Sequence, residues 1–530
     1  MSEGSWRGRV VEAWRALDER RAALLAFLVT AAVGVSTMTS DLIGVFFDDA
    51  VYVLVGKALA EGKGFVYLQL PGLPPAIHYP PVFPALIALV WKLGPAFPEN
   101  IGLLKAMNPL ILGAAAAGGT VALHRLLGLS VGAALCTMLA ATVSIPMQVL
   151  ANVLLSEPLF IALLFPTLWY AERLRVDGGW RLAVAAGVLA GTLVLTRTIA
   201  GAFVAGIGLV LLMDRRWREL AVFSTVVAVM LAPWQYFVWK HSPGFPDELR
   251  GSYGPYLEWV ANGYREGGLP FLREVVQKNV FDAFRSTGAV LTPLLPSGPI
   301  RPTAAALAVL ATLGGIGVAL AQPRMRALAF GTMGYLAVVL AWPFQVERFL
   351  WAVWPLLLAF ALLGARAAHG TLQAAGRTRI AATAAVAAGL LVFGYGVYNA
   401  RGFSRGWASS VSRQLSAREE PVVMALNRDP RVRGKVLAAE AAPLVALYTG
   451  LQVVPVEILW VQDHLRGKTM EQRVAILEAV DASFRPDVYA LKANGPYLYA
   501  LSRAQLEASR RFVELSASDA EVRIFLHTGQ

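Results

Sequence analysis

Long apolar runs recur through the first 400 residues, and short connectors rich in arginine separate them. Most of the runs are about 15 to 20 residues long, close to the length that a helix needs to cross a bilayer. This pattern is typical of a polytopic membrane protein. We therefore expect a mainly α-helical chain with about 11 to 13 transmembrane helices.

The pattern changes after residue 400, where polar and apolar positions mix over short stretches. KVLAAEAAPLVALYTG and LQVVPVEILW show the alternation or the helical periodicity of soluble α/β proteins, and PDVYALKA is typical of a short buried strand before a turn. Two domains are therefore expected. Residues 1–400 form a transmembrane domain, and residues 401–530 form a small soluble α/β domain.

The arginine-rich connectors predict which side of the membrane each segment faces, because such connectors favour the cytoplasm. The N-terminal segment is one of them, and the apolar run after it lacks the features of a removable signal peptide. The loop that follows this first span, about residues 40–100, then lies on the outer face. Alternating the later spans places the C-terminal domain outside as well. The stretch 82–94 is too short to cross upright and would break the alternation, so we expect an interfacial or re-entrant helix there.

Composition agrees with this interpretation. Of the 530 residues, 56% are hydrophobic and 15% are charged, which is typical of a membrane protein. The net charge of +12 could suggest a nucleic-acid partner, but the basic residues lie mostly in the connectors, where membrane topology explains them. We expect no nucleic-acid partner. Cys136 is the only cysteine, so no intramolecular disulfide can form.

Several charged or polar side chains fall on the outer face in this topology. They are Asp48, Asp49, His78, Glu157, Arg197 and Arg348. Polar groups at a membrane boundary are costly to bury and are functional candidates for that reason. Adjacent carboxylates that are shielded from water raise the proton affinity of one of them, as a general base requires. Arginine is suited to phosphate oxygens. Together these features suggest group transfer from a lipid phosphate.

Each of these residues also has a purely structural alternative. Asp48 could be the N-cap of a helix that starts at residue 50. Glu157 stands before a proline at a helix start, where an acid suits the helix dipole. Arg197 could anchor a helix turn near the headgroups. Arg348 could form a surface ion pair with Glu347, worth about 0 to 1 kcal/mol.

Six segments, in this order and spacing, resemble the GT-C superfamily of membrane glycosyltransferases. They are FFDDAVYVLVGKALAEGKGF, HYPPVFPALIALVWKLG, LSEPLFIALL, GTLVLTRTIAG, LAPWQYFVWKH and ERFLWAVWPLLL. The resemblance is strongest to bacterial relatives of the dolichyl-phosphate-mannose protein mannosyltransferases and to the lipid A aminoarabinose transferase, ArnT. It covers roughly residues 20–365. It implies a GT-C fold and a sugar donor carried on a polyprenyl phosphate.

The resemblance also implies roles for single residues. The first acid of the outer loop in that family is the catalytic base, which is Asp48 here, with Asp49 in place of the usual second acid, Glu. Glu157 stands where the family has its next acidic residue, and Asp48, Asp49 and Glu157 are the expected catalytic residues. Further substrate-binding residues are expected from the same matches and from their position on the outer face. They are Tyr52, Lys57, His78, Tyr79, Arg197 and Arg348.

The sequence as a whole therefore predicts a polyprenyl-phosphate-sugar-dependent glycosyltransferase of the bacterial inner or plasma membrane. A hydroxyl of a glycan, lipid or protein acceptor would attack the sugar from the outer side with inversion, and Asp48 would take its proton. A divalent metal could be held by Asp48, Asp49, Glu157 or His78, since hard cations favour carboxylates. The alternatives are a polytopic transporter or lipid-linked sugar flippase, and a non-catalytic envelope scaffold.

Overall fold

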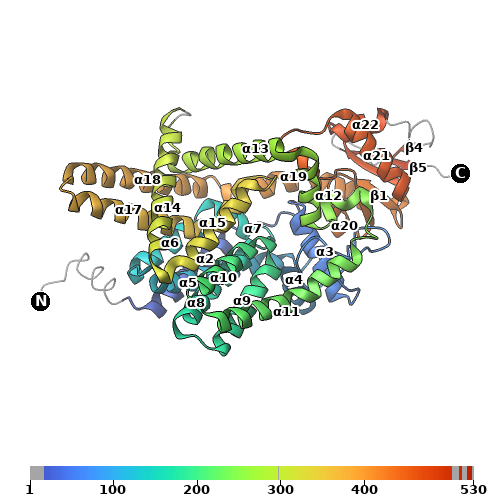
Figure 1. The fold of residues 1–530 in the computed structure, drawn as a ribbon. Coiled ribbons are helices and arrows are strands. Elements are labelled where there is room, and N and C mark those ends of the chain that lie inside the picture. The colour runs from blue at the N-terminus through green and yellow to red at the C-terminus, as the bar shows by residue number, and fades with distance from the viewer. Residues whose placement is uncertain (1–16, 296–297, 504–511, 516–521, 528–530) are drawn as a thin grey trace, which may run out of the picture.

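The computed structural model describes residues 17–295, 298–503, 512–515 and 522–527. Helices dominate up to residue 428, and a small mixed sheet follows (Figure 1). The long helices of the first part follow the apolar runs of the sequence. They are α2 (Glu19–Ser36), α5 (Ile101–Leu127), α6 (Val131–Thr142), α7 (Ile145–Asn152), α8 (Glu157–Asp177), α9 (Trp180–Thr196), α10 (Gly201–Met213), α11 (Trp217–His241), α14 (Ile300–Ala321), α15 (Arg326–Ala341), α17 (Trp354–Ala374) and α18 (Thr378–Ser404).

Connectors between these helices use ordinary end signals. Helix α5 ends at Gly128, whose φ of 63° lies in the left-handed region that glycine adopts without strain. Helix α6 begins three residues later at Val131, and the side chain of its N-cap, Ser130, accepts a hydrogen bond from the Ala133 N–H. The three residues from Gly128 to Ser130 therefore form the turn and carry the end signals of both helices.

Six helices in the described ranges are long and apolar enough to cross a membrane: α5, α11, α14, α15, α17 and α18. The bent pair α6 and α7 passes the same test when taken together. The described residues thus hold six such helices, or seven with the bent pair, which is fewer than the 11 to 13 expected. Helices α2, α8, α9 and α10 lie where the sequence predicted further spans, but α9 and α10 are shorter, α2 carries charged residues at its start, and α8 carries them at both ends. The chain is an integral membrane protein, mainly α-helical.

Small residues bring two of these helices into close contact. Helices α14 and α17 pack against each other through Gly315 and Gly364. A Cβ atom on Gly364 would lie 1.9 Å from the carbonyl oxygen of Ala311, and one on Gly315 would lie equally close to that of Phe360. Helices associate in a bilayer through close packing of this kind, because the hydrophobic effect contributes little to their association there.

The loop after α2 contains α3 (Asp48–Ala60) and α4 (Val82–Leu93), which pack against each other. Helix α4 has 12 residues and rises about 18 Å, well short of the hydrocarbon thickness. This length agrees with the short helix expected over 82–94. The polar stretch 241–268 contains η2 (Asp247–Leu249), α12 (Arg250–Tyr253) and the start of α13 (Tyr256–Leu291), which is kinked at Gly268.

The last part of the chain is a small α/β domain, as expected. Its helices are α19 (Trp407–Arg428), α20 (Ala442–Thr449), α21 (Met470–Phe484) and α22 (Pro496–Arg503), and its strands are β1 (Val436–Ala439), β2 (Gln452–Pro455), β3 (Val488–Lys492), β4 (Phe512–Glu514) and β5 (Val522–His527). The strand order is β2-β1-β3-β5-β4. Strands β2 and β3 flank β1 in parallel, and β5 is antiparallel to β3 and to β4.

Short elements complete the fold. They are α16 (Val346–Ala352) and the 3₁₀ turns η1 (Thr198–Ala200), η3 (Pro323–Met325), η4 (Pro430–Val432) and η5 (Val461–His464). The α/β domain lies at one end of the molecule, where α20 contacts α3 (Figure 1). The start of α3, which carries the paired aspartates, therefore lies close to both parts of the chain.

Candidate active site

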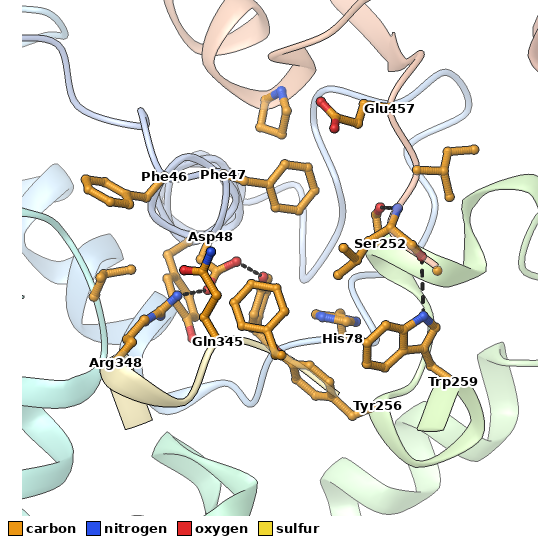
Figure 2. A pocket seen from close by; sticks show the side chains of 18 of the residues that line it. Phe46, Phe47, Asp48, His78, Ser252, Tyr256, Trp259, Gln345, Arg348 and Glu457 are labelled. Atoms are coloured by element: carbon orange, nitrogen blue, oxygen red, sulfur yellow. Dashed lines mark hydrogen bonds and ion pairs between the residues drawn. The ribbon is translucent and has the colours of Figure 1, made fainter. Parts of the chain in front are cut away.

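A large cavity lies between the helical part and the C-terminal domain. Its volume is about 2220 Å³, and it is lined by the start of α3, the loop before α4, the ends of α11, α12 and α16, and the C-terminal domain. Figure 2 shows its centre, where Asp48 and Arg348 face each other and Glu457 of the C-terminal domain also lines the wall.

The start of α3 presents Asp48 to this cavity. The residue before it, Phe47, is the N-cap, and its φ of 65° is unusual for a residue with a side chain. Asp48 is thus the first helical residue and does not cap the helix, so the structural alternative for Asp48 is wrong. Its Oδ1 accepts a hydrogen bond from the Tyr79 hydroxyl at 2.6 Å, and its Oδ2 accepts one from Arg348 Nη1 at 2.6 Å.

Asp49 points the other way and is almost fully buried. Its carboxylate accepts hydrogen bonds from the backbone N–H groups of Gly44 and Phe46, both at 2.8 Å, and from its neighbour Ala50. These contacts hold the turn that leads into α3. Asp49 does not line the cavity, and its geometry is that of a residue that positions Asp48.

Arg348 links Asp48 to Glu157. Its Nε donates to Glu157 Oε1 at 2.5 Å, while its Nη1 is the atom that contacts Asp48. The surface pair with Glu347 considered above is not formed, because Glu347 accepts a hydrogen bond from Ser286 instead. Arg348 comes from α16 and Glu157 from the first turn of α8, so the three residues join distant parts of the chain.

Arg197 completes the cluster from the other side of Glu157. It stands between α9 and η1, and its Nη1 lies 2.9 Å from Glu157 Oε1 and 3.0 Å from Ser156 Oγ. The same Ser156 hydroxyl lies 3.2 Å from the Tyr52 hydroxyl. Two carboxylates and two guanidinium groups are therefore balanced in charge. Asp48, Glu157, Arg197 and Arg348 are called the charge cluster below.

Two atoms of the charge cluster stay without a partner. Glu157 is fully buried, and its Oε2 has no hydrogen-bond partner among the described residues. The same holds for Nε of Arg197, which is 9% exposed. Buried polar atoms in proteins are nearly always paired. An unpaired donor on a cavity wall is therefore available to a bound water or ligand.

The two neighbouring aspartates differ in acidity. Burial alone would raise the pKa of Asp48, but the charge of Arg348 and the hydrogen bonds from Tyr79 and Arg348 outweigh it and leave the pKa below its usual value. Burial raises the pKa of Asp49 to about 6, and the charge of Asp48 adds to this. The raised proton affinity expected for one of the pair therefore falls on Asp49, while Asp48 stays ionised.

His78 is held in place by its surroundings. Its Nδ1 donates to the carbonyl oxygen of Gly254 at 2.5 Å, and its ring lies against Tyr256 with ring centroids 3.8 Å apart. Burial lowers the pKa of His78 to about 4, so the ring is neutral near pH 7. It shapes the cavity wall beside Tyr79.

The acidic residues proposed as metal ligands do not converge on one point. Asp48 and Glu157 are bridged by Arg348, and Asp49 is bonded to backbone N–H groups. Within the described ranges, no group of three or more His, Cys, Asp or Glu side chains could hold a metal ion. A cation between carboxylates that already share an arginine would meet like charge. The site does not fit a divalent metal.

Lys57 is not part of this arrangement. It lies near the other end of α3, 4.0 Å from Glu61 and 5.7 Å from the centre of the Trp91 ring. It does not line the cavity, unlike Tyr52, His78 and Tyr79. Lys57 comes nine residues after Asp48 on the same helix. It therefore lies more than two helical turns from Asp48.

Several site residues were not predicted from the sequence. Ser156 joins Arg197 to Tyr52, and Tyr256 lies against His78. Gln345 lines the cavity beside Arg348 (Figure 2). Ser156 stands directly before Glu157, so the sequence could have marked it as a neighbour of a site residue. Tyr256 lies in the polar stretch 241–268, and no pattern in the sequence marked it.

The chain is similar to two solved structures. One is ArnT from Cupriavidus metallidurans bound to undecaprenyl phosphate, with 15% sequence identity, a TM-score of 0.47, and coverage of 94% of this chain and 97% of that chain. The other is the apo state of the same protein, with 17% identity, a TM-score of 0.45, and coverage of 97% and 98%. No family model and no curated protein matches the chain. Both structures are of ArnT, the protein type that the motif resemblance named.

Proposed function

We propose that this protein is a glycosyltransferase that moves a sugar from a polyprenyl-phosphate donor to an acceptor hydroxyl on the outer face of the membrane. The charge cluster carries this proposal. It combines an ionised carboxylate with one buried and one partly buried arginine at a cavity that is bordered by membrane helices. A base beside a phosphate clamp is what transfer from a lipid phosphate requires.

Asp48 is the proposed base. The acceptor oxygen attacks the anomeric carbon while the bond from that carbon to the phosphate oxygen breaks, and the phosphate leaves with the electron pair. The proton of the acceptor hydroxyl passes to Asp48. Attack opposite the departing phosphate inverts the configuration at the anomeric carbon. Tyr79 holds one oxygen of Asp48, which orients the carboxylate toward the cavity.

The two arginines are suited to the phosphate. Arg348 uses Nε and Nη1 for its carboxylate partners, which leaves Nη2 outside both contacts. Arg197 Nε is the unpaired donor on the same wall. Guanidinium groups bind phosphate through paired N–H donors and stabilise charge that develops on a leaving oxygen.

Donor binding and base strength are coupled in this arrangement. Arg348 lowers the pKa of Asp48 when no phosphate is bound. A phosphate that binds Arg348 draws the guanidinium away from Asp48 and adds negative charge nearby, and both effects raise the pKa of Asp48. The carboxylate therefore becomes a stronger base only when the donor is present.

The prenyl chain would lie along α11. This helix is long and apolar enough to span, and its Trp234, Val238 and Trp239 line the cavity. Trp239 is 71% exposed, as suits a residue at a lipid interface. A donor anchored in the bilayer can therefore place its phosphate in the cavity without leaving the membrane.

The test compares wild type with Asp48→Asn in nanodiscs, with a panel of polyprenyl-phosphate sugars and an envelope extract as the acceptor source. We expect the variant to lose at least about 100-fold in the single-turnover rate while it still binds the donor. Asp247→Asn is the matched control, because Asp247 is an exposed acid of η2 outside the cavity lining. Equal turnover by wild type and Asp48→Asn would refute the proposed base. Wild type that moves lipid across the bilayer without any transfer would favour a flippase.

A further inference from the structure

The cavity has a second polar wall, far from the charge cluster along the sequence. This wall is formed by residues at the carboxyl ends of three parallel strands. Glu440 follows β1, Glu457 lies two residues after β2, Lys492 ends β3, and Asn494 comes just after it. All four line the same cavity as Asp48. They are called the sheet-edge residues below.

The topology of the sheet places these residues at a natural binding position. From β1 the chain passes through α20 to β2 on one side, and then through α21 to β3 on the other side of β1. Ligands of open α/β sheets bind at the carboxyl ends of the strands, where the connections diverge in this way. Here that crevice opens into the proposed active site instead of into solvent alone.

We propose that the sheet-edge residues bind the acceptor, and that this acceptor presents a neutral saccharide to them. This inference rests on the proposed function. It gives the C-terminal domain a part in the reaction, because the acceptor hydroxyl has to reach Asp48 through the same cavity.

The chemistry of the sheet-edge residues favours hydroxyl groups over phosphate. Lys492 Nζ lies 2.7 Å from Glu419 and 3.4 Å from Glu440, and both carboxylate side chains are at least nine-tenths buried. Lys492 is thus shared by two carboxylates. Glu457 is exposed in the cavity, and burial raises the pKa of Glu440, with a further contribution from the charge of Glu457. The carboxylates accept hydrogen bonds from sugar hydroxyls and the Asn494 amide can donate or accept them, whereas a phosphate beside Glu440 and Glu457 would meet like charge.

The size of the cavity allows two substrates at once. About 2220 Å³ is well above the roughly 300 to 1,000 Å³ of a pocket for one small ligand. In Figure 2, Glu457 and Asp48 line the pocket on either side of Phe47 in this view. A donor sugar at the charge cluster therefore leaves room for a saccharide at the sheet edge.

Binding without transfer is the first test. Calorimetry on the full-length protein in nanodiscs, with no donor present, uses maltotetraose, cellotetraose and chitotetraose as neutral probes and glucose 6-phosphate as the anionic one. We expect wild type to bind at least one neutral probe and Glu457→Gln to bind it about 10-fold more weakly, because a hydrogen bond to a charged acceptor is lost. Glu420→Gln, on the same helix as Glu419 but outside the lining, should bind like wild type. Preference for glucose 6-phosphate, or no binding of any neutral probe, would overturn the inference.

Kinetics form the second test. With any acceptor that wild type uses, Glu457→Gln and Glu440→Gln should raise the acceptor KM about 10-fold and leave the donor KM and the rate at saturating acceptor unchanged. An unchanged acceptor KM in both variants would refute the acceptor site. Absence of any transfer by wild type would refute the proposed function but would leave the binding result standing. Failure of the proposed function and failure of the acceptor site are therefore distinguishable.

Discussion

Arg348 holds the site together through one guanidinium group. Its two partners are 300 and 191 positions away in the sequence, and both contacts are 2.6 Å or shorter. The sequence placed Asp48, Glu157, Arg197 and Arg348 on one side of the membrane by counting crossings. Counting crossings gives only the side of the membrane on which a residue lies. It could therefore not separate Lys57, which lies at the far end of α3, from the residues of the charge cluster.

The buried Glu157 is the residue on which the stability of the charge cluster depends most. Glu157→Ala leaves Arg197 and Arg348 without their common partner, and breaking a buried pair in this way costs about 3 to 5 kcal/mol. We expect a clear drop in the midpoint of thermal unfolding in nanodiscs. Asp177→Ala, at the exposed end of the same helix, is the control and should change stability by less than about 1 kcal/mol. Equal midpoints for the two variants would contradict a stabilising charge cluster.

Asp49 predicts a pH dependence of stability. Its pKa is about 6 in the fold and lies near 3.8 when unperturbed, so the folded state binds the proton more tightly than the unfolded state. The contribution is fully present below about pH 4 and is lost as the pH rises through 6. Wild type should therefore lose about 2 to 3 kcal/mol from this group between pH 4 and pH 7. Thermal unfolding across this range should show a flatter profile for Asp49→Asn, and an identical profile in the variant would contradict the raised pKa.

At the scale of elements, the helices were predictable because apolar length is a strong signal. Helices α9 and α10, for example, follow the apolar runs on the two sides of Arg197. Helix α13 was not expected, because its first turns are polar and carry several glycines, including Gly268 at the kink. Its contacts with other elements decide its structure, and these are not visible in a local pattern.

The contact between α14 and α17 gives a prediction at this scale. Gly364→Ala should lower the unfolding midpoint by a few °C, because the new methyl group would collide with the backbone of α14. Gly317→Ala, also in α14, is the control, since a Cβ there meets nothing within 4 Å. Alanine at such an open helical position is neutral or slightly stabilising. The same midpoint for both variants would show that the close packing is absent.

On the scale of the whole molecule, the C-terminal domain and the helical part meet along the cavity. Leu459 N–H donates to Ser252 Oγ at 3.0 Å, and a Cβ on Gly251 would lie 2.1 Å from the Leu459 carbonyl oxygen. The sequence predicted an α/β domain after residue 400, and the sheet confirms it. The boundary at 400 and the outer-face orientation stay predictions, and α18 itself continues to Ser404. That the domain closes the cavity depends on long-range contacts, which the sequence does not display.

Gly251→Leu tests this contact. The larger side chain should push the C-terminal domain away from α12, so that limited proteolysis removes the domain sooner and transfer falls by at least about 10-fold, since closure of the cavity is lost. Gly244→Ala serves as the control, because a Cβ there meets nothing within 4 Å. Proteolysis of Gly251→Leu at the wild-type rate would show that the two parts do not depend on this contact.

The link that Arg348 makes between α3, α8 and α16 has a consequence for biosynthesis. Asp48 and Glu157 are translated long before Arg348, so a nascent chain holds two carboxylates near the bilayer with one of their cations still missing. Like charges repel, so these two groups gain nothing from meeting before α16 is present. An incomplete or wrongly inserted chain therefore lacks the assembled charge cluster, and under the proposed function it would be inactive.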